Sequence, residues 1–182
     1  MLPMRETKAI NMAHVHLLER EMVDPSLKNL LGGPMENVVR GLAYQPERLK
    51  AWLRFYSPLI WQDGALEVEL KELVRLQIAA YYDCDVCQSV RNPLVEERGL
   101  SEEKVECVAR PGLLGSEKLT DRERTALAFS WKMTVDHQNL RPADFDGLRA
   151  HFTEEQIVEL GWLASAFIGF GRLTRGFDLL EL

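Results

Sequence analysis

The stretch from residue 66 to residue 98 places the strongest limits on what this chain can fold into. Apolar side chains recur every three or four residues between Leu66 and Tyr81, the spacing that puts them on one face of an α-helix. The charged side chains of this stretch are expected on the opposite face, in solvent. A Cys-x-x-Cys pair, Cys84 and Cys87, follows directly. We therefore expect one helix, a short break, and a second helix that continues to the end of the stretch.

Both cysteines are predicted to lie at the N-terminal end of that second helix. Asp83 is suited to cap it, with Cys84 at the first helical position and Cys87 one turn further on. The partial positive charge of a helix N-terminus favours the thiolate, which is the reactive form of cysteine. The spacing also brings the two sulfur atoms close enough to bond. The pair is therefore expected to exist either as two thiols or as one disulfide.

Charged neighbours act on these thiols in opposite directions. Arg91 follows Cys87 by four residues, which would place both on one helical face. A guanidinium there would stabilise a thiolate, although it keeps its proton and so cannot act as a general base. Asp83 and Asp85 disfavour a thiolate because they carry the same charge. The sign of the net effect on Cys84 stays open.

The order of these residues resembles the carboxymuconolactone decarboxylase-like family, specifically its AhpD-like alkylhydroperoxidase branch. The resemblance rests on Glu72, followed twelve positions later by Cys84 and then by Cys87, and its core covers roughly residues 45 to 108. It implies an all-α fold, an AhpD-like helical bundle. It also implies assembly into trimers, hexamers or dimers, with the cysteine pair near a subunit contact.

The resemblance further implies roles for individual residues. Cys87 would attack a peroxide, Cys84 would resolve the product, and Glu72 would belong to a proton relay. The family pattern has a histidine four residues after the second cysteine, where this chain has Arg91. This departure affects the relay and leaves the dithiol intact. His137, at or beyond the end of another predicted helix, is a candidate substitute base.

Composition narrows the class of protein. A length of 182 residues with 46% hydrophobic and 27% charged residues predicts one globular domain, residues 1–182, with an N-terminal arm at 1–33 that has helical potential from about residue 8. The net charge of −6, without a basic cluster, argues against nucleic acid and anionic membranes as partners. Three cysteines and no secretory pattern at the start predict a cytoplasmic, reducing setting. The longest uncharged run, 160 to 171, is shorter than the roughly 20 residues that cross a bilayer.

Start and stop signals mark the other helices. Pro46 is suited to the first position of a helix, Gly99 to the end of one, and capping boxes begin at Thr120 and Thr153. The helix after the second box is apolar nearly all round from 157 to 170, so it must be buried by the core or by another subunit. No segment shows the alternation of a β-strand. The fold class predicted from these patterns is all-α.

Three functions fit the sequence. The preferred one is a thiol-dependent antioxidant oxidoreductase that reduces a hydroperoxide with its dithiol and is regenerated by an external dithiol reductant, without a cofactor or a metal. A zinc site is a second reading, but Cys84 and Cys87 supply only two of four ligands, so it would have to be completed across subunits. A third is a non-peroxidase member of the family, either a lactone enzyme like the decarboxylase or a helical scaffold. Cys107 is expected to be a buried, inert side chain.

Overall fold

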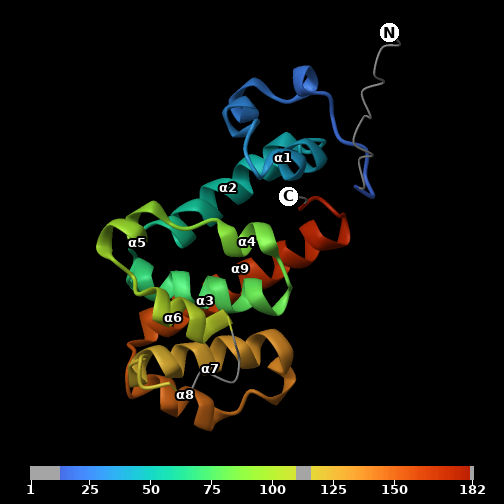
Figure 1. The fold of residues 1–182 in the computed structure, drawn as a ribbon. Coiled ribbons are helices and arrows are strands. Elements are labelled where there is room, and N and C mark those ends of the chain that lie inside the picture. The colour runs from blue at the N-terminus through green and yellow to red at the C-terminus, as the bar shows by residue number, and fades with distance from the viewer. Residues whose placement is uncertain (1–12, 110–115, 181–182) are drawn as a thin grey trace.

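The computed structural model describes residues 13–109 and 116–180, and every regular element in these two stretches is a helix (Figure 1). The predicted all-α fold is confirmed for this part of the chain. The α-helices are α1 (Glu36–Leu42), α2 (Pro46–Trp61), α3 (Val68–Tyr81), α4 (Asp85–Ser89), α5 (Pro93–Arg98), α6 (Glu102–Ala109), α7 (Asp121–Val135), α8 (Pro142–Arg149) and α9 (Glu154–Gly176). Short 3-10 helices in the described residues are η1 (Arg20–Met22), η2 (Pro25–Leu30) and η4 (His137–Asn139).

Local signals account for most of these boundaries. Pro46 begins α2, and capping boxes at Thr120 and Thr153 begin α7 and α9, as predicted. Gly99 ends α5 with φ of 75°, a left-handed conformation that glycine adopts without strain. The N-terminal arm differs from the prediction, because residues 13 to 18 are not helical. The start of that predicted helix, near residue 8, lies outside the described residues.

Helix α3 lies at the centre of the fold. It contacts α2, α4, α5, α6, α7 and α9, and every residue from 70 to 79 is buried. The prediction that the charged side of this helix faces solvent is therefore wrong, since Lys71, Glu72 and Arg75 all lie inside the protein. Tyr81, which was expected to extend the buried face, is 46% exposed. Surrounding helices, and not the helix's own periodicity, decide what α3 buries.

The buried charges of α3 all have partners. Lys71 forms an ion pair with Glu159 of α9 and donates a hydrogen bond to the backbone carbonyl of Gln62 at 3.0 Å. Glu72 and Arg75 form an ion pair with each other within α3. An isolated charge in such a position would cost several kcal/mol. The pairing therefore allows polar side chains to occupy the central helix.

Helix α9 is the apolar helix predicted at 157 to 170, and it packs against α2, α3, α7 and α8. An 18-residue stretch with a mean hydropathy of 1.2 makes it long and apolar enough to cross a membrane, judged by length and composition alone. Half of that stretch is buried against the other helices. Core helices of globular proteins commonly have this composition.

The helices are arranged so that α4 lies near the middle of the molecule. Figure 1 shows α1, α2 and residues 13–33 at one end and α7 and α8 at the opposite end, with α3 and α9 between them. The short helices α4 and α5 follow α3 and cross beside it. The segment that carries the two cysteines is thereby placed against the central helix.

Candidate functional site

A tight turn joins α3 to the cysteine pair. The backbone N–H of Cys84 donates to the Ala79 carbonyl at 3.1 Å, and that of Asp83 donates to the Ala80 carbonyl at 3.2 Å. These two bonds form a Schellman motif, which ends a helix with one residue in the left-handed conformation. Asp83 is that residue, with φ of 50°. Asp83 therefore terminates α3 and does not cap the next helix, contrary to the prediction.

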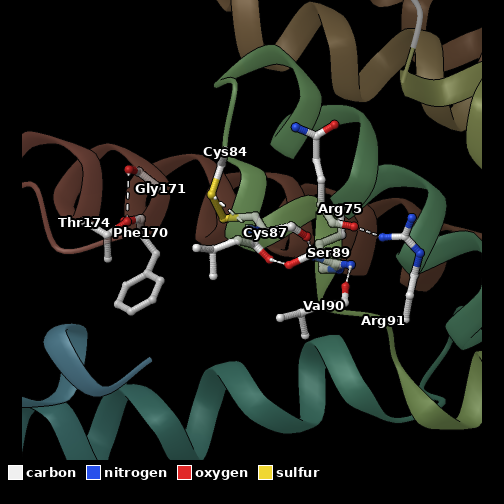
Figure 2. Close-up of a disulfide and its surroundings, with 11 residues drawn as sticks. Arg75, Cys84, Cys87, Ser89, Val90, Arg91, Phe170, Gly171 and Thr174 are labelled. Atoms are coloured by element: carbon white, nitrogen blue, oxygen red, sulfur yellow. Dashed lines mark hydrogen bonds between the residues drawn. A yellow bond between two sulfur atoms is a disulfide. The ribbon is translucent and has the colours of Figure 1, made fainter. Parts of the chain in front are cut away.

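Cys84 takes the capping position of α4 itself. Its Sγ accepts a hydrogen bond from the backbone N–H of Cys87 at 3.2 Å. The two cysteines are joined by a disulfide, with their Cα atoms 5.2 Å apart (Figure 2). The predicted ability of the pair to form a disulfide is thus confirmed.

Helix α4 ends after Ser89, so the predicted continuous helix to residue 98 is wrong. Asn92 precedes Pro93, and a residue before proline is disfavoured in the helical conformation. Asn92 instead has an extended backbone and begins α5 by accepting a hydrogen bond from the Leu94 N–H at 3.0 Å. The Asn-Pro pair was the signal in the sequence that would have located this break.

Arg91 lies in the linker between α4 and α5, so it does not share a helical face with Cys87. Its Nη1 donates to the backbone carbonyl of Gln88. Figure 2 shows the guanidinium turned to that carbonyl and set apart from the two sulfur atoms. The same-face argument for Arg91 therefore fails, and the side chain caps the end of α4.

Arg75 is the arginine that contacts Cys87, and nothing in the sequence pattern marked it as a site residue. Its Nη1 donates to the Cys87 carbonyl at 2.5 Å, and its Nη2 donates to the Val90 carbonyl at 2.6 Å. Its Nε and Nη2 also donate to the two carboxylate oxygens of Glu72, at 2.7 and 2.8 Å. One guanidinium thus joins Glu72 to the helix that carries Cys87. The available signal was a spacing of three residues between two opposite charges on one helix.

Arg75 separates Glu72 from α4, the helix that carries Cys87. The side chain of Glu72 is fully buried, and its carboxylate also accepts the backbone N–H of Asn92 at 3.3 Å. The guanidinium of Arg75 lies over the rings of Trp61 and Phe167, at 5.8 and 5.9 Å from their centroids. Such contacts stabilise a cation that has lost its water. The ion pair is therefore enclosed by carbonyl groups, one amide and two aromatic rings.

Two cavities meet at the cysteine pair. The larger, of about 380 Å³, reaches Cys87 and Arg75 and is mostly apolar, with walls that include Tyr56, Trp61, Val86, Val90, Phe167 and Phe170. The smaller, of about 100 Å³, reaches both cysteines and is more polar, with Asp83, Asp85 and Arg175 in its wall. Figure 2 shows Phe170 of α9 projecting toward α2, beside the disulfide. Cys87 therefore borders both cavities, while Cys84 borders the smaller one.

The larger cavity offers few polar groups. Burial raises the pKa of the Tyr56 phenol, so its hydroxyl stays protonated across the physiological pH range. Glu72 is not among the residues that line this cavity, whereas Arg75 is. The cavity is thus suited to an apolar compound of modest size that meets Cys87 at one end.

The other candidate residues lie elsewhere. His137 is exposed in η4, just after α7, and lines neither cavity. Cys107 is a free, buried cysteine in the main core, as expected. Across residues 13–109 and 116–180, no three or more histidine, cysteine or acidic side chains gather closely enough to hold a metal ion.

This combination of an all-helical fold, a buried central helix and a cysteine pair in the turn that follows it defines an AhpD-like helical bundle. The sequence pattern of the carboxymuconolactone decarboxylase family matches residues 46–130, from the start of α2 into α7. The chain is similar to this family over that part of its length.

Solved structures with the same fold extend over nearly the whole chain. A peroxidase-related protein from Silicibacter sp. TM1040 superposes with a TM-score of 0.75 at 18% identity, over 96% of this chain and 94% of that one. An alkylhydroperoxidase AhpD core protein from Ralstonia eutropha JMP134 gives 0.73 at 20% identity, over 94% and 93%. The debrominase Bmp8, in complex with 2,3,4-tribromopyrrole, gives 0.71 at 18% identity, over 96% and 94%. Among curated proteins, none matches the sequence significantly.

Proposed function

We propose that the protein is a thiol-dependent oxidoreductase that reduces an organic hydroperoxide through Cys87 and Cys84. The observation that carries the proposal is the place of Cys87, which is bonded to Cys84 and also borders an apolar cavity of about 380 Å³. An apolar hydroperoxide in that cavity meets one sulfur. The second sulfur stands next to it, ready to complete a disulfide.

The reaction divides into three steps. The Cys87 thiolate attacks the peroxide, the O–O bond breaks, and the products are a Cys87 sulfenic acid and an alkoxide that takes a proton from water to give the alcohol. The Cys84 thiol then condenses with the sulfenic acid, forming the disulfide and releasing water. An external dithiol reduces the disulfide by exchange and is itself oxidised. The sum is one hydroperoxide and one dithiol converted to alcohol, water and a new disulfide.

The setting follows from the same chemistry. Regeneration needs a supply of reduced dithiol, so we propose a cytoplasmic, reducing compartment, where such reductants are kept. No metal or cofactor takes part in these steps. The proposal includes no nucleic acid or membrane partner, because the net charge is −6.

Reductive dehalogenation of an aromatic compound is a second candidate. The specific observation in its favour is the aromatic wall of the larger cavity, together with the likeness of the fold to a debrominase. A Cys87 thiolate would take bromine from the ring as a sulfenyl bromide, while the ring carbon takes a proton from water. Cys84 would then displace bromide to form the same disulfide. Both candidates use the same two sulfurs and end in the same oxidised state.

Thiol counting after rapid mixing tests the proposal. Reduced protein is mixed with cumene hydroperoxide, with a bromopyrrole, or with buffer, and the free thiols are followed with time. We expect the hydroperoxide to remove two thiols per chain far faster than it oxidises free glutathione, and to leave Cys107. Loss of two thiols only with the bromopyrrole would replace peroxide reduction by dehalogenation. If neither compound reacts faster than with glutathione, both peroxide reduction and dehalogenation are rejected.

We further propose that the protein is a homo-oligomer, a trimer, hexamer or dimer, as the family resemblance implies. An open apolar groove of about 1220 Å³ lies between α2, α9 and the segment around His14. Large apolar side chains in its wall are exposed, among them Tyr44 (57%), Phe55 (39%) and Trp162 (56%). A contiguous exposed apolar surface of this kind is typical of a protein–protein contact. A second copy of the chain is the occupant that we propose.

Replacement of Trp162 with glutamate is expected to lower the molar mass in solution, because it places a charge in the proposed contact. The matched control is Val158→Glu, on the same helix, equally exposed at 57% and outside the groove. Light scattering after size exclusion would measure both. A wild-type chain that is already monomeric, or equal losses of mass in the two variants, would reject this contact.

A further inference from the structure

The family pattern places a histidine after the second cysteine, and here that position cannot serve the thiol. Arg91 occupies it, is not helical, and caps the Gln88 carbonyl at a distance from the sulfur atoms (Figure 2). A cation does lie next to Cys87, but it comes from the central helix. Arg75 contacts the backbone carbonyl of Cys87 itself and borders the same cavity.

The order of the charges around Cys87 follows from these contacts. The guanidinium of Arg75 lies between Glu72 and α4, with one edge on the carboxylate and the other on the carbonyls of Cys87 and Val90. The positive member of the ion pair is therefore nearer to Cys87 than the negative one. In a buried site, the nearer charge has the larger effect on an ionising group.

Other charged groups around the pair come from the smaller cavity. Asp83 and Asp85 precede and begin α4, and Arg175 reaches the same cavity from α9. Tyr56, from α2, is neutral because burial raises its pKa. The carboxylates flank Cys84 in the chain, whereas Arg75 contacts Cys87.

Four of the five N–H groups of the guanidinium have hydrogen-bond partners. Arginine has five N–H groups. Four of those in Arg75 are accounted for by Glu72, Cys87 and Val90, and among the contacts of the described residues the second N–H of Nη1 has no partner. The side chain is held rigidly by these bonds and by the two rings. Its charge is therefore fixed in place before any substrate arrives.

We propose that Arg75 is the positioning residue that keeps Cys87 as a thiolate in the reduced protein, a role that rests on the thiol chemistry proposed above. A guanidinium keeps its proton throughout the physiological pH range. It accepts no proton from Cys87, which releases its proton to water. Arg75 stabilises the resulting anion, and it also holds the turn that carries the sulfur through the carbonyls of Cys87 and Val90.

Alkylation of Cys87 measures this role without any peroxide. In a Cys84→Ser background, the rate of Cys87 modification by iodoacetamide at pH 6 reports the fraction of thiolate, and peptide mass spectrometry separates Cys87 from Cys107. We expect Arg75→Met to slow this alkylation by about tenfold or more, because the cation is lost and the Glu72 carboxylate remains. We expect Glu72→Gln to accelerate it, because the cation then lacks a counter-charge. Arg54→Met, which removes an exposed arginine from α2, is the control and should change the rate little.

Opposite changes in the Cys87 alkylation rate, one for each member of the ion pair, distinguish an electrostatic effect from a loss of structure. A purely structural ion pair would give changes of the same sign, or none, in Arg75→Met and Glu72→Gln, and that result would overturn the proposal. Because Arg75→Met leaves a buried charge and could unfold the chain, Arg75→Lys provides a second test. We expect the lysine variant to alkylate within about threefold of wild type, since it keeps the charge. A folded lysine variant as slow as the methionine variant would also overturn it.

The alkylation test and the peroxide test can fail separately. Failure of the alkylation test with rapid peroxide reduction would leave the function intact and remove Arg75 from it. The expected alkylation pattern without peroxide reduction would show an activated thiol that serves another substrate.

Discussion

Replacing Cys87 with serine is expected to slow oxidation of the reduced protein by cumene hydroperoxide by about a thousandfold or more. Loss of the attacking nucleophile removes the first bond-forming step, and losses of this size or larger are typical when a nucleophile is deleted. Rapid mixing with thiol detection measures the rate. Cys107→Ala, which changes a buried cysteine outside both cavities, is the matched control and should retain the wild-type rate.

The Cys84→Ser variant is expected to behave differently. Cys87 still attacks the peroxide, so one thiol is lost at a rate near that of wild type, but no disulfide can form. The sulfenic acid then persists and can be trapped with dimedone, and turnover with an external dithiol falls. If Cys84→Ser abolishes the first step while Cys87→Ser retains it, the two roles are reversed. The larger cavity, which Cys87 borders and Cys84 does not, would then not be the substrate site.

The parts of the fold that the sequence predicted are those that depend on neighbouring residues. The capping boxes at Thr120 and Thr153, the proline at the start of α2 and the glycine after α5 act within one helical turn, so their effect can be judged without knowing the fold. The cysteine pair is equally local, because a spacing of three residues is enough to allow the disulfide.

The errors arose where distant segments decide the outcome. The charges of α3 were predicted to face solvent, but six other helices cover that helix and bury Lys71, Glu72 and Arg75. Arg75 reaches the carbonyls of Cys87 and Val90 only because the α3–α4 turn folds α4 back beside α3, which no local pattern specifies. The family resemblance identified Glu72 as a site residue. Only the structure shows that Arg75 pairs with it and contacts Cys87.

The break after α4 is an intermediate case. The signal, Asn92 before Pro93, is local and was present in the sequence. The prediction continued the second helix through it to residue 98 and thereby placed Arg91 on the face of Cys87. A proline inside a predicted helix therefore indicates that the helix ends before it, because proline sterically restricts the backbone of the preceding residue.

The buried ion pair should dominate the stability of this region. Arg75→Met is expected to lower the free energy of unfolding by about 3–5 kcal/mol, since it leaves the Glu72 carboxylate buried without its cation. Glu72→Gln combined with Arg75→Met should recover a large part of that loss, because both charges are gone and the two replacements are close in size to the originals. Urea denaturation of the single and double variants measures the coupling between the two residues.

An exposed pair in the same protein supplies the comparison. Arg20 and Glu36 form a two-point pair with N–O distances of 2.7 and 2.6 Å, much like Arg75 and Glu72, but Arg20 is 60% exposed. Arg20→Met should therefore cost far less than Arg75→Met, because water replaces the contacts of the exposed guanidinium and Arg40 stays beside Glu36. If Arg75→Met costs no more than Arg20→Met, water reaches the Glu72 carboxylate, and α3 and α4 are held together chiefly by their apolar contacts.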